Sequence, residues 1–224
     1  MSHPVALTLI LFALAACGDA DPERETPTTD PGAATSPDRP ERRTDTLSIE
    51  GMAEPLSLRL FRAPDHFPLP FTAYVPEQMV AEPGDEAVRF VAAFGGERNQ
   101  DAFLHVFVFP PDTDRQAAIA AAKGYKTGRG IPVSQGIEII ADELPPPNLA
   151  WALEDFRFRY QSHGQWYAGT IGVGRQADRF FMIVRHYPAE YGDGFPPRAD
   201  LIQETWRWAD GTHLTTPEAD PAGR

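Results

Sequence analysis

The segment from Ala102 to Phe109 constrains the fold more than any other part of the chain. In it, alternate positions carry Phe103, His105, Phe107 and Phe109, and the positions between them carry Leu104, Val106 and Val108. Successive side chains of a strand point to opposite faces, so a strand with this pattern is apolar on both faces. The sequence therefore predicts a sheet that is covered on both sides rather than wet on one.

Further strands are expected on both sides of this segment. Leu56, Leu58 and Leu60 alternate with other residues and predict a hairpin over residues 46–61. Single strands are expected at 71–75 and 87–94, and an antiparallel meander at 151–160, 165–174 and 179–187. The second turn of the meander predicts that Gly172 faces Phe181 and Gly174 faces Arg179, so that the glycines leave room for bulky neighbours.

Two helices complete the expected fold. An Ala-rich run predicts a helix over residues 112–123, capped by Asp112 or Thr113, closed by Gly124 and joining two halves of the sheet. A second helix is expected from Pro197 to about Trp208, and its buried stripe is Leu201, Ile202, Thr205 and Trp206. The predicted class is α+β, with a mainly antiparallel sheet of about six to seven strands and helices packed on its faces.

Cys17 is the only cysteine among the 224 residues. It ends the run Leu14-Ala15-Ala16-Cys17, which follows the short apolar stretch from Val5 to Ala13 and resembles the lipobox of bacterial lipoproteins. The resemblance implies cleavage between Ala16 and Cys17 and acylation of Cys17. Residues 2–16 carry no Lys or Arg, which departs from the usual pattern and leaves open an uncleaved anchor or a different start codon.

The chain therefore divides into four expected parts. Residues 1–16 are a signal peptide, and residues 17–45 are the lipidated cysteine and a disordered linker rich in Pro, Thr and Asp. Residues 46–208 form one globular domain, and residues 209–224 form a disordered tail. We expect export and lipid anchoring to a bacterial membrane, with the periplasmic side of the outer membrane favoured.

Cysteine content and net charge restrict the chemistry and the partners that the chain can have. Without a cysteine in the domain, disulfides, thiol nucleophiles and cysteine-ligated metals are excluded there. The net charge of −12 disfavours nucleic acid and anionic headgroups, so the lipid on Cys17 is the expected contact with the membrane.

Short motifs suggest a family. The hairpin Glu50-Gly51-Met52-Ala53-Glu54 is similar to that of bacterial lipoproteins with PsbP/Mog1-like domains. The ending is similar too, from Phe180-Phe181-Met182-Ile183-Val184 through Tyr187-Pro188-Ala189-Glu190 and Phe195 to the Trp-bearing helix. The resemblance covers about residues 46–208 and implies an α/β/α sandwich with binding and assembly roles. It supplies no catalytic residues.

Catalytic and metal motifs are few. The sequence has no Gly-x-Ser-x-Gly elbow and no His-Glu-x-x-His, and no cofactor is expected. His105 and His186 could meet across the sheet, either as hydrogen-bonded core residues, which we favour, or as a metal pair. Glu154 and Asp155 point to opposite faces and cannot act as paired carboxylates.

Charged and aromatic residues offer other sites. Arg157, Arg159 and Arg185 are expected to pair with the two acids of the meander. Lys126 and Arg129 lie in a Gly-rich connection that follows its helix, whereas a phosphate-binding loop precedes one; an anionic partner segment could still dock there.

An exposed aromatic groove is the main candidate binding site in the sequence. It would be lined by four residues: Trp166, Tyr187, Tyr191 and Phe195. The favoured function is a non-catalytic binding or assembly module whose partner is an envelope protein or a small ligand. The alternative is a hydrolase or metal-assisted enzyme whose residues meet only in three dimensions.

Overall fold

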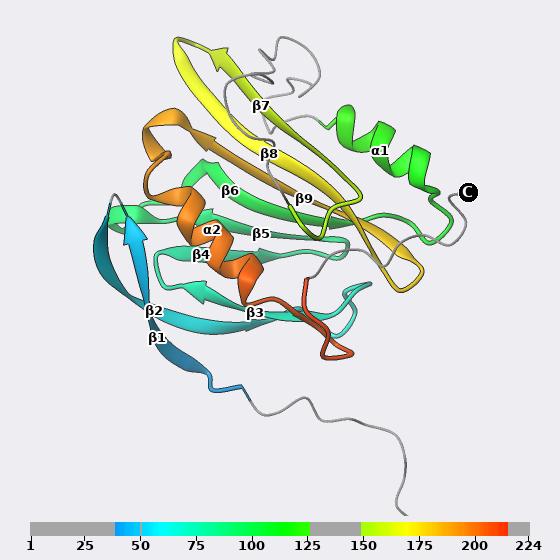
Figure 1. The fold of residues 1–224 in the computed structure, drawn as a ribbon, viewed down its shortest axis with the longest axis horizontal. Coiled ribbons are helices and arrows are strands. Elements are labelled where there is room, and N and C mark those ends of the chain that lie inside the picture. Colours follow the sequence, from blue (N-terminus) through cyan, green and yellow to red (C-terminus); the bar gives the residue numbers. More distant parts are fainter. Residues whose placement is uncertain (1–38, 50, 126–148, 215–224) are drawn as a thin grey trace, which may run out of the picture. The chain divides into compact units, whose positions relative to one another are not determined.

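A computed structural model of the chain describes residues 39–49, 51–125 and 149–214, which form ten strands and two α-helices (Figure 1). The strands are β1 Arg42–Ile49, β2 Met52–Arg62, β3 Phe71–Pro76, β4 Met79–Pro83, β5 Ala87–Ala92, β6 Asn99–Val108, β7 Glu154–Ser162, β8 Gln165–Gln176, β9 Arg179–Pro188 and β10 Arg207–Trp208. The helices are α1 Arg115–Lys123 and α2 Phe195–Glu204. Short 3₁₀ turns lie at Phe94–Gly96 and Ala189–Tyr191.

The strands form two antiparallel sheets. One has the order β1-β2-β3-β10, and the other has the order β4-β5-β6-β9-β8-β7. In the six-stranded sheet β6 pairs with β9, so α1 lies in the connection between its two three-stranded halves, as predicted (Figure 1).

The strand β6 is buried on both faces, which confirms the prediction from its sequence. On one face Leu104, Val106 and Val108 are fully buried, and on the other Phe103 is 3% exposed while His105 and Phe107 are half-buried. Each face belongs to a different apolar core, and together these cores cover both sides of the sheet.

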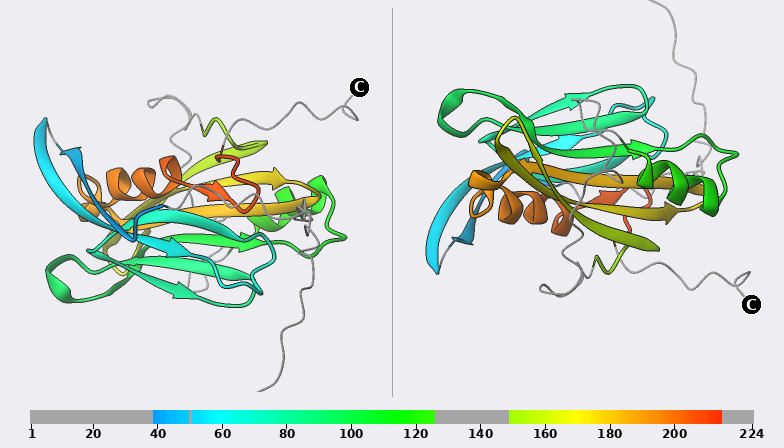
Figure 2. Two further views of the ribbon diagram at one scale, coloured as in Figure 1. Left: turned by 90° about the horizontal axis from the view of Figure 1, so that it is seen from below. Right: turned by 90° about the horizontal axis from the view of Figure 1, so that it is seen from above.

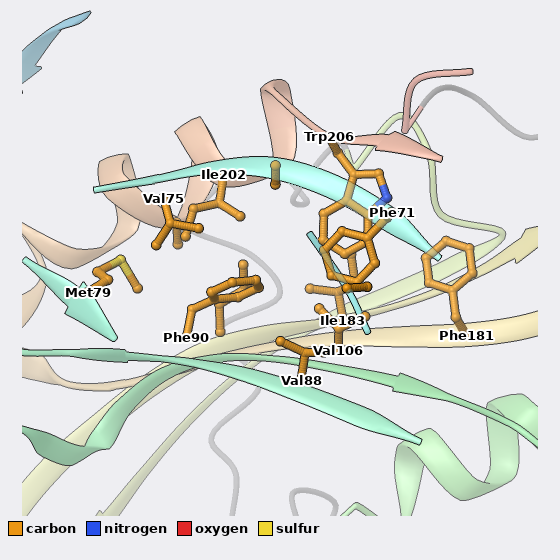
Figure 3. Close-up of a cluster of buried hydrophobic side chains, with 14 of the residues drawn as sticks. Phe71, Val75, Met79, Val88, Phe90, Val106, Phe181, Ile183, Ile202 and Trp206 are labelled. Atoms are coloured by element: carbon orange, nitrogen blue, oxygen red, sulfur yellow. The ribbon is translucent and has the colours of Figure 1, made fainter. Parts of the chain in front are cut away.

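The larger core lies between the two sheets and α2 (Figure 3). Phe71 and Val75 of β3 face Phe90 of β5 and Ile183 of β9, and Ile202 of α2 closes one side. Trp206 stacks on Phe71, with 3.6 Å between ring centroids. Burial of such side chains contributes about 1.5–3 kcal/mol each. The second core lies on the opposite face, under Ala118 and Ala122 of α1.

The α+β class and the mainly antiparallel pairing are confirmed, but the prediction of one sheet was wrong. The strands β1, β2 and β3 form a second sheet with β10, and that sheet and α2 cover one face where only helices were expected (Figure 2). Local alternation predicts strands but contains no information on which strands pair. The short strands β4 and β10 were missed.

Several element ends differ from the predictions. Asp114 caps α1 by accepting the N–H of Ala117, whereas Asp112 or Thr113 was expected; Gly124 follows the last turn as predicted. The second helix begins at Phe195 and ends at Glu204, so Trp206 and Trp208 lie beyond it. Leu201, Ile202 and Trp206 are buried as predicted, whereas Thr205 is only partly buried and its hydroxyl accepts the backbone N–H of Tyr74.

The register of the meander is shifted by two residues from the predicted one. Its second turn has two residues, Ala177 and Asp178, and Gln176 pairs with Arg179. Gly172 therefore faces Ile183, and Gly174 faces Phe181. The predicted reason for the glycines holds, because a Cβ on Gly172 would overlap Trp151 and one on Gly174 would overlap the ring of Phe181.

The ordered segments reach beyond the predicted domain ends. The strand β1 begins at Arg42, four residues before the predicted boundary at 46, and the hydroxyl of Tyr74 donates to the carbonyl of Pro40. At the other end, His213 forms an isolated bridge with Arg207. Neither helix within the described ranges is long and apolar enough to cross a membrane.

Candidate binding face

The meander β7-β8-β9 presents two chemically different faces. Alternate residues of the three strands place Phe158, Tyr160, Tyr167 and His186 in the core under α1. The residues between them point to the opposite side of the sheet. These are Arg157 and Arg159 of β7, Trp166 and Thr170 of β8, and Arg185 and Tyr187 of β9, and we call this set the arginine face.

Strand register brings these residues together. Arg157 pairs with Thr170, which pairs with Arg185, so the two arginines flank one threonine. Neighbouring strands lie about 4.8 Å apart, which puts the backbones of Arg157 and Arg185 about 10 Å apart. Arg159 lies two residues along β7 from Arg157, at about 6.8 Å, on the same face. Three arginine side chains therefore leave the sheet within a small area of this face.

The three arginines have different partners. A nitrogen of Arg185 lies 2.6 Å from the carboxylate of Asp200 on α2, and the Arg185 side chain is 12% exposed. Arg159 lies over the ring of Trp166 at 4.3 Å, which leaves the edge of the guanidinium available for hydrogen bonds. Within the described ranges no carboxylate lies at ion-pair distance from Arg157 or Arg159.

This arrangement corrects the predicted pairing of the arginines with Glu154 and Asp155. Arg185 uses an acid from α2, because the helix packs over β9. Asp155 accepts the backbone N–H of Leu149 at 3.3 Å. Burial raises the pKa of Asp155, and nearby Arg157 acts in the opposite direction.

The Tyr187 hydroxyl is a hydrogen-bond donor on the same face. Burial raises the pKa of Tyr187, while the charges of Arg185 and Arg157 act to lower it. The group is therefore protonated at neutral pH. The face offers guanidinium and hydroxyl donors beside two aromatic rings, which is a chemistry suited to carboxylates or other oxyanions.

The four residues of the predicted aromatic groove are distributed over separate places. Tyr187 contacts Phe195, with 5.6 Å between ring centroids, but Phe195 is 0% exposed and belongs to the core. Tyr191 stacks on Phe94, and the ring of Trp166 lies under the guanidinium of Arg159. Phe195 was placed in the groove because the start of α2 was predicted two residues late, which left Phe195 in a loop.

His105 and His186 share one face of the sheet but do not face each other. His186 is opposite Phe103, and His105 is opposite Val184. His105 lies 2.8 Å from the Tyr125 hydroxyl, and burial together with Arg89 lowers the pKa of His105 to about 4.

His186 is held from both ring nitrogens. Its Nδ1 donates to the backbone carbonyl of Asp101 at 2.7 Å, since that oxygen can only accept. In the neutral ring, Nε2 then accepts from the Tyr160 hydroxyl at 2.8 Å. The contacts are those of hydrogen-bonded core histidines, and no group of three or more potential metal ligands occurs in the described part of the chain.

Other predicted sites lie outside the described residues. They are the cleavage and acylation positions Ala16 and Cys17 and the basic connection with Lys126 and Arg129. The arginine face itself was missed. Arginines at alternate positions of a predicted strand were the available signal, and they were assigned to neighbouring acids instead.

Comparison with known proteins adds no assignment. No protein-family model matches the chain, and no curated protein is significantly similar to it.

Proposed function

We propose that this chain is a non-catalytic binding module, exported and held at a bacterial membrane by lipid on Cys17, and that the arginine face recognises its partner. The observation that carries the proposal is the pair Arg157 and Arg159. They share one face of a strand, and neither has a carboxylate at ion-pair distance in the described structure.

The position of this pair makes it distinctive. The net charge is −12, yet only six of the fifteen arginines in the described ranges have a carboxylate at ion-pair distance. Arg157 and Arg159 are among the other nine, and they share one face of a strand at the edge of its sheet. Arg42, Arg62 and Arg98 each form an ion pair, with Glu77, Glu41 and Glu82 respectively. Two adjacent arginines without such partners favour an anionic group on another molecule.

The sequence of the N-terminus supports the anchoring part of the proposal. Leu14-Ala15-Ala16-Cys17 has the small residues and the thiol that lipoprotein processing requires. Two or three acyl chains give stable attachment, whereas one gives only marginal binding. We place the module on the periplasmic side of the outer membrane and propose a PsbP/Mog1-like sandwich. Antiparallel sheets with two α-helices are compatible with that fold.

Labelling tests the anchor. Cells expressing the chain are fed a radioactive fatty acid, and the Cys17→Ala variant is the control. Label on the wild-type chain and none on the variant is expected. Equal label on both chains would contradict acylation at Cys17.

Site-specific photocrosslinking in intact cells tests the binding face. A photoreactive amino acid replaces Trp166, and a second chain carries it at the exposed Thr44 of β1 as a control. We expect one discrete adduct from position 166 that is absent from position 44 and is lost when Arg157→Glu is added. Identical adduct patterns from the two positions, or none from position 166, would overturn the proposal.

A further inference from the structure

We infer that the partner docks on the β7 edge as an extended segment in which acidic and apolar residues alternate, adding a strand to the six-stranded sheet. The inference rests on the proposed function and names the chemistry that the arginine face would recognise. It depends on β7 being an edge strand and on the different chemistry of its two sides.

The strand β7 is the last strand of its sheet. It has nine residues and pairs only with β8 among the described strands. An edge strand presents backbone N–H and C=O groups to which another extended chain can bond. These bonds supply affinity without sequence preference, so side chains must supply the specificity.

The side chains of β7 define that specificity. One side presents Asp155, Arg157, Arg159 and Gln161, and the other presents Phe156, Phe158 and Tyr160. In a neighbouring strand, directly opposed side chains lie about 5 Å apart on the same face. Acidic residues two positions apart would therefore face Arg157 and Arg159, and the residue between them would lie beside Phe158.

The same geometry sets the register. Asp155 would repel an acid placed opposite it, so the acidic positions of the partner are those facing Arg157 and Arg159. Each carboxylate can then accept two N–H groups from its guanidinium. The guanidinium of Arg159 is already oriented by its contact with Trp166.

A second copy of this chain is a poor occupant for this edge. If two β7 strands paired with their arginine-bearing stretches opposed, Arg157 and Arg159 would face arginines of the other copy. The β1 edge differs, because its Arg43 already pairs with Asp45 at 2.8 Å. Charge complementarity therefore selects an acidic partner strand and selects the β7 edge to receive it.

Peptide binding to the full chain in detergent tests the inference. The probe, called the alternating peptide, is a fluorescent nine-residue peptide with Glu at positions 4 and 6 and Val or Thr at the other positions, so that its two acids face Arg157 and Arg159 and none faces Asp155. The control peptide has the same composition, with its Glu residues contiguous. Fluorescence anisotropy should show clear preference for the alternating peptide. Methylation of the backbone nitrogens that face β7 should abolish binding, because strand addition needs those donors.

Charge reversal assigns the contact. Arg157→Glu/Arg159→Glu should weaken binding about tenfold or more, because two attractions become two repulsions. The matched control is Arg42→Glu/Arg98→Glu, which makes the same change in net charge elsewhere and should alter the Kd less than twofold. An alternating Lys peptide should bind the Arg157→Glu/Arg159→Glu chain better than it binds the wild type. Circular dichroism verifies that each variant is folded.

The outcomes separate this inference from the proposed function. Equal binding of the two Glu peptides, or equal loss in both double variants, would mean unspecific charge attraction and would overturn strand addition. If adducts from position 166 persist in cells while the alternating peptide fails to bind, strand addition is wrong and the proposed face stands. If those adducts are also absent, both are wrong.

Discussion

The two faces of the β7-β8-β9 meander come from the same three strands yet use their side chains in opposite ways. Under α1, the ring of Phe158 lies 6.0 Å from that of His186, which in turn lies 5.0 Å from Phe103 of the neighbouring strand β6. On the other side, Arg157 and Arg159 have no carboxylate partner within the described ranges.

The difference shows how to separate structural from functional polar groups. His186 is 1% exposed and both its ring nitrogens are hydrogen-bonded, so its hydrogen-bonding groups are satisfied inside the domain. Arg157 and Arg159 are only partly buried, and no carboxylate of residues 39–49, 51–125 or 149–214 lies at ion-pair distance from either. Polar groups of the first kind stabilise the fold, and groups of the second kind are available to a partner. Mutations on the two faces should therefore affect different properties.

Gly169 should be the most sensitive position of the meander. A Cβ there would overlap the carbonyl oxygen of Arg185 and would lie 2.8 Å from Cε1 of Phe158. Gly169→Ala should lower the free energy of unfolding by about 3 kcal/mol or more, because a backbone atom cannot move aside easily. Urea denaturation measures the loss. Ala168→Ser, one residue away on the opposite face, is the control and should stay within about 0.5 kcal/mol. Similar values for both would remove the distinction between the faces.

Replacing His186 should be the next most damaging change. His186→Leu removes the hydrogen bonds to Tyr160 and Asp101 and should cost about 2–3 kcal/mol. Tyr160→Phe, which removes only the hydroxyl, should cost about 1 kcal/mol. The loss of unfolding free energy in the double variant should be smaller than the sum of the two single losses, because both substitutions remove the same hydrogen bond. Full additivity in chemical denaturation would show that this bond contributes nothing.

The sequence predicted the face under α1, which we call the closed face, better than the arginine face, which we call the open face. Alternation of large apolar residues indicated buried strands, and burial on both sides of β6 followed from its own residues. The start of α2 at Phe195 was missed because Pro196 and Pro197 suggested a loop followed by a helix start at Pro197, although proline is also favourable in the first turn.

The candidate face depended on pairing that the sequence does not contain. Arg185 lies 26 residues after Arg159, and only the register of β8 and β9 brings them to one surface. The acid that pairs with Arg185 comes from α2, so the partner could not be inferred from strand neighbours. Local pattern identifies elements, whereas the chemistry of a sheet face requires the strand order.

His105 should make stability depend on pH on the closed side. Its pKa is about 4 in the folded chain and 6.5 as the ordinary value, so the unfolded chain binds the proton more tightly. The stability that the folded chain has with His105 neutral is therefore fully present above pH 6.5 and is lost as pH falls from 6.5 toward 4. Between pH 7 and pH 5 the loss should be about 1–2 kcal/mol.

Comparison with His105→Gln isolates this effect. Glutamine can accept the Tyr125 hydroxyl bond but does not titrate, so the variant should lose less stability over the same pH range. Urea denaturation at pH 7 and pH 5 gives the two differences. Equal pH dependence in both proteins would show that other groups account for it.

Arg159→Gln on the open face should change stability least of all. The side chain has no ion pair in the described structure and contacts Trp166 near the surface, so the free energy of unfolding should move by less than about 0.5 kcal/mol. The crosslinked adduct from position 166 should nevertheless decline, because glutamine removes the charge. A loss of stability comparable to that of His186→Leu would mean that Arg159 is structural, and would remove the main reason for treating the two faces as different in kind. Unchanged stability with a reduced adduct would support recognition by the open face.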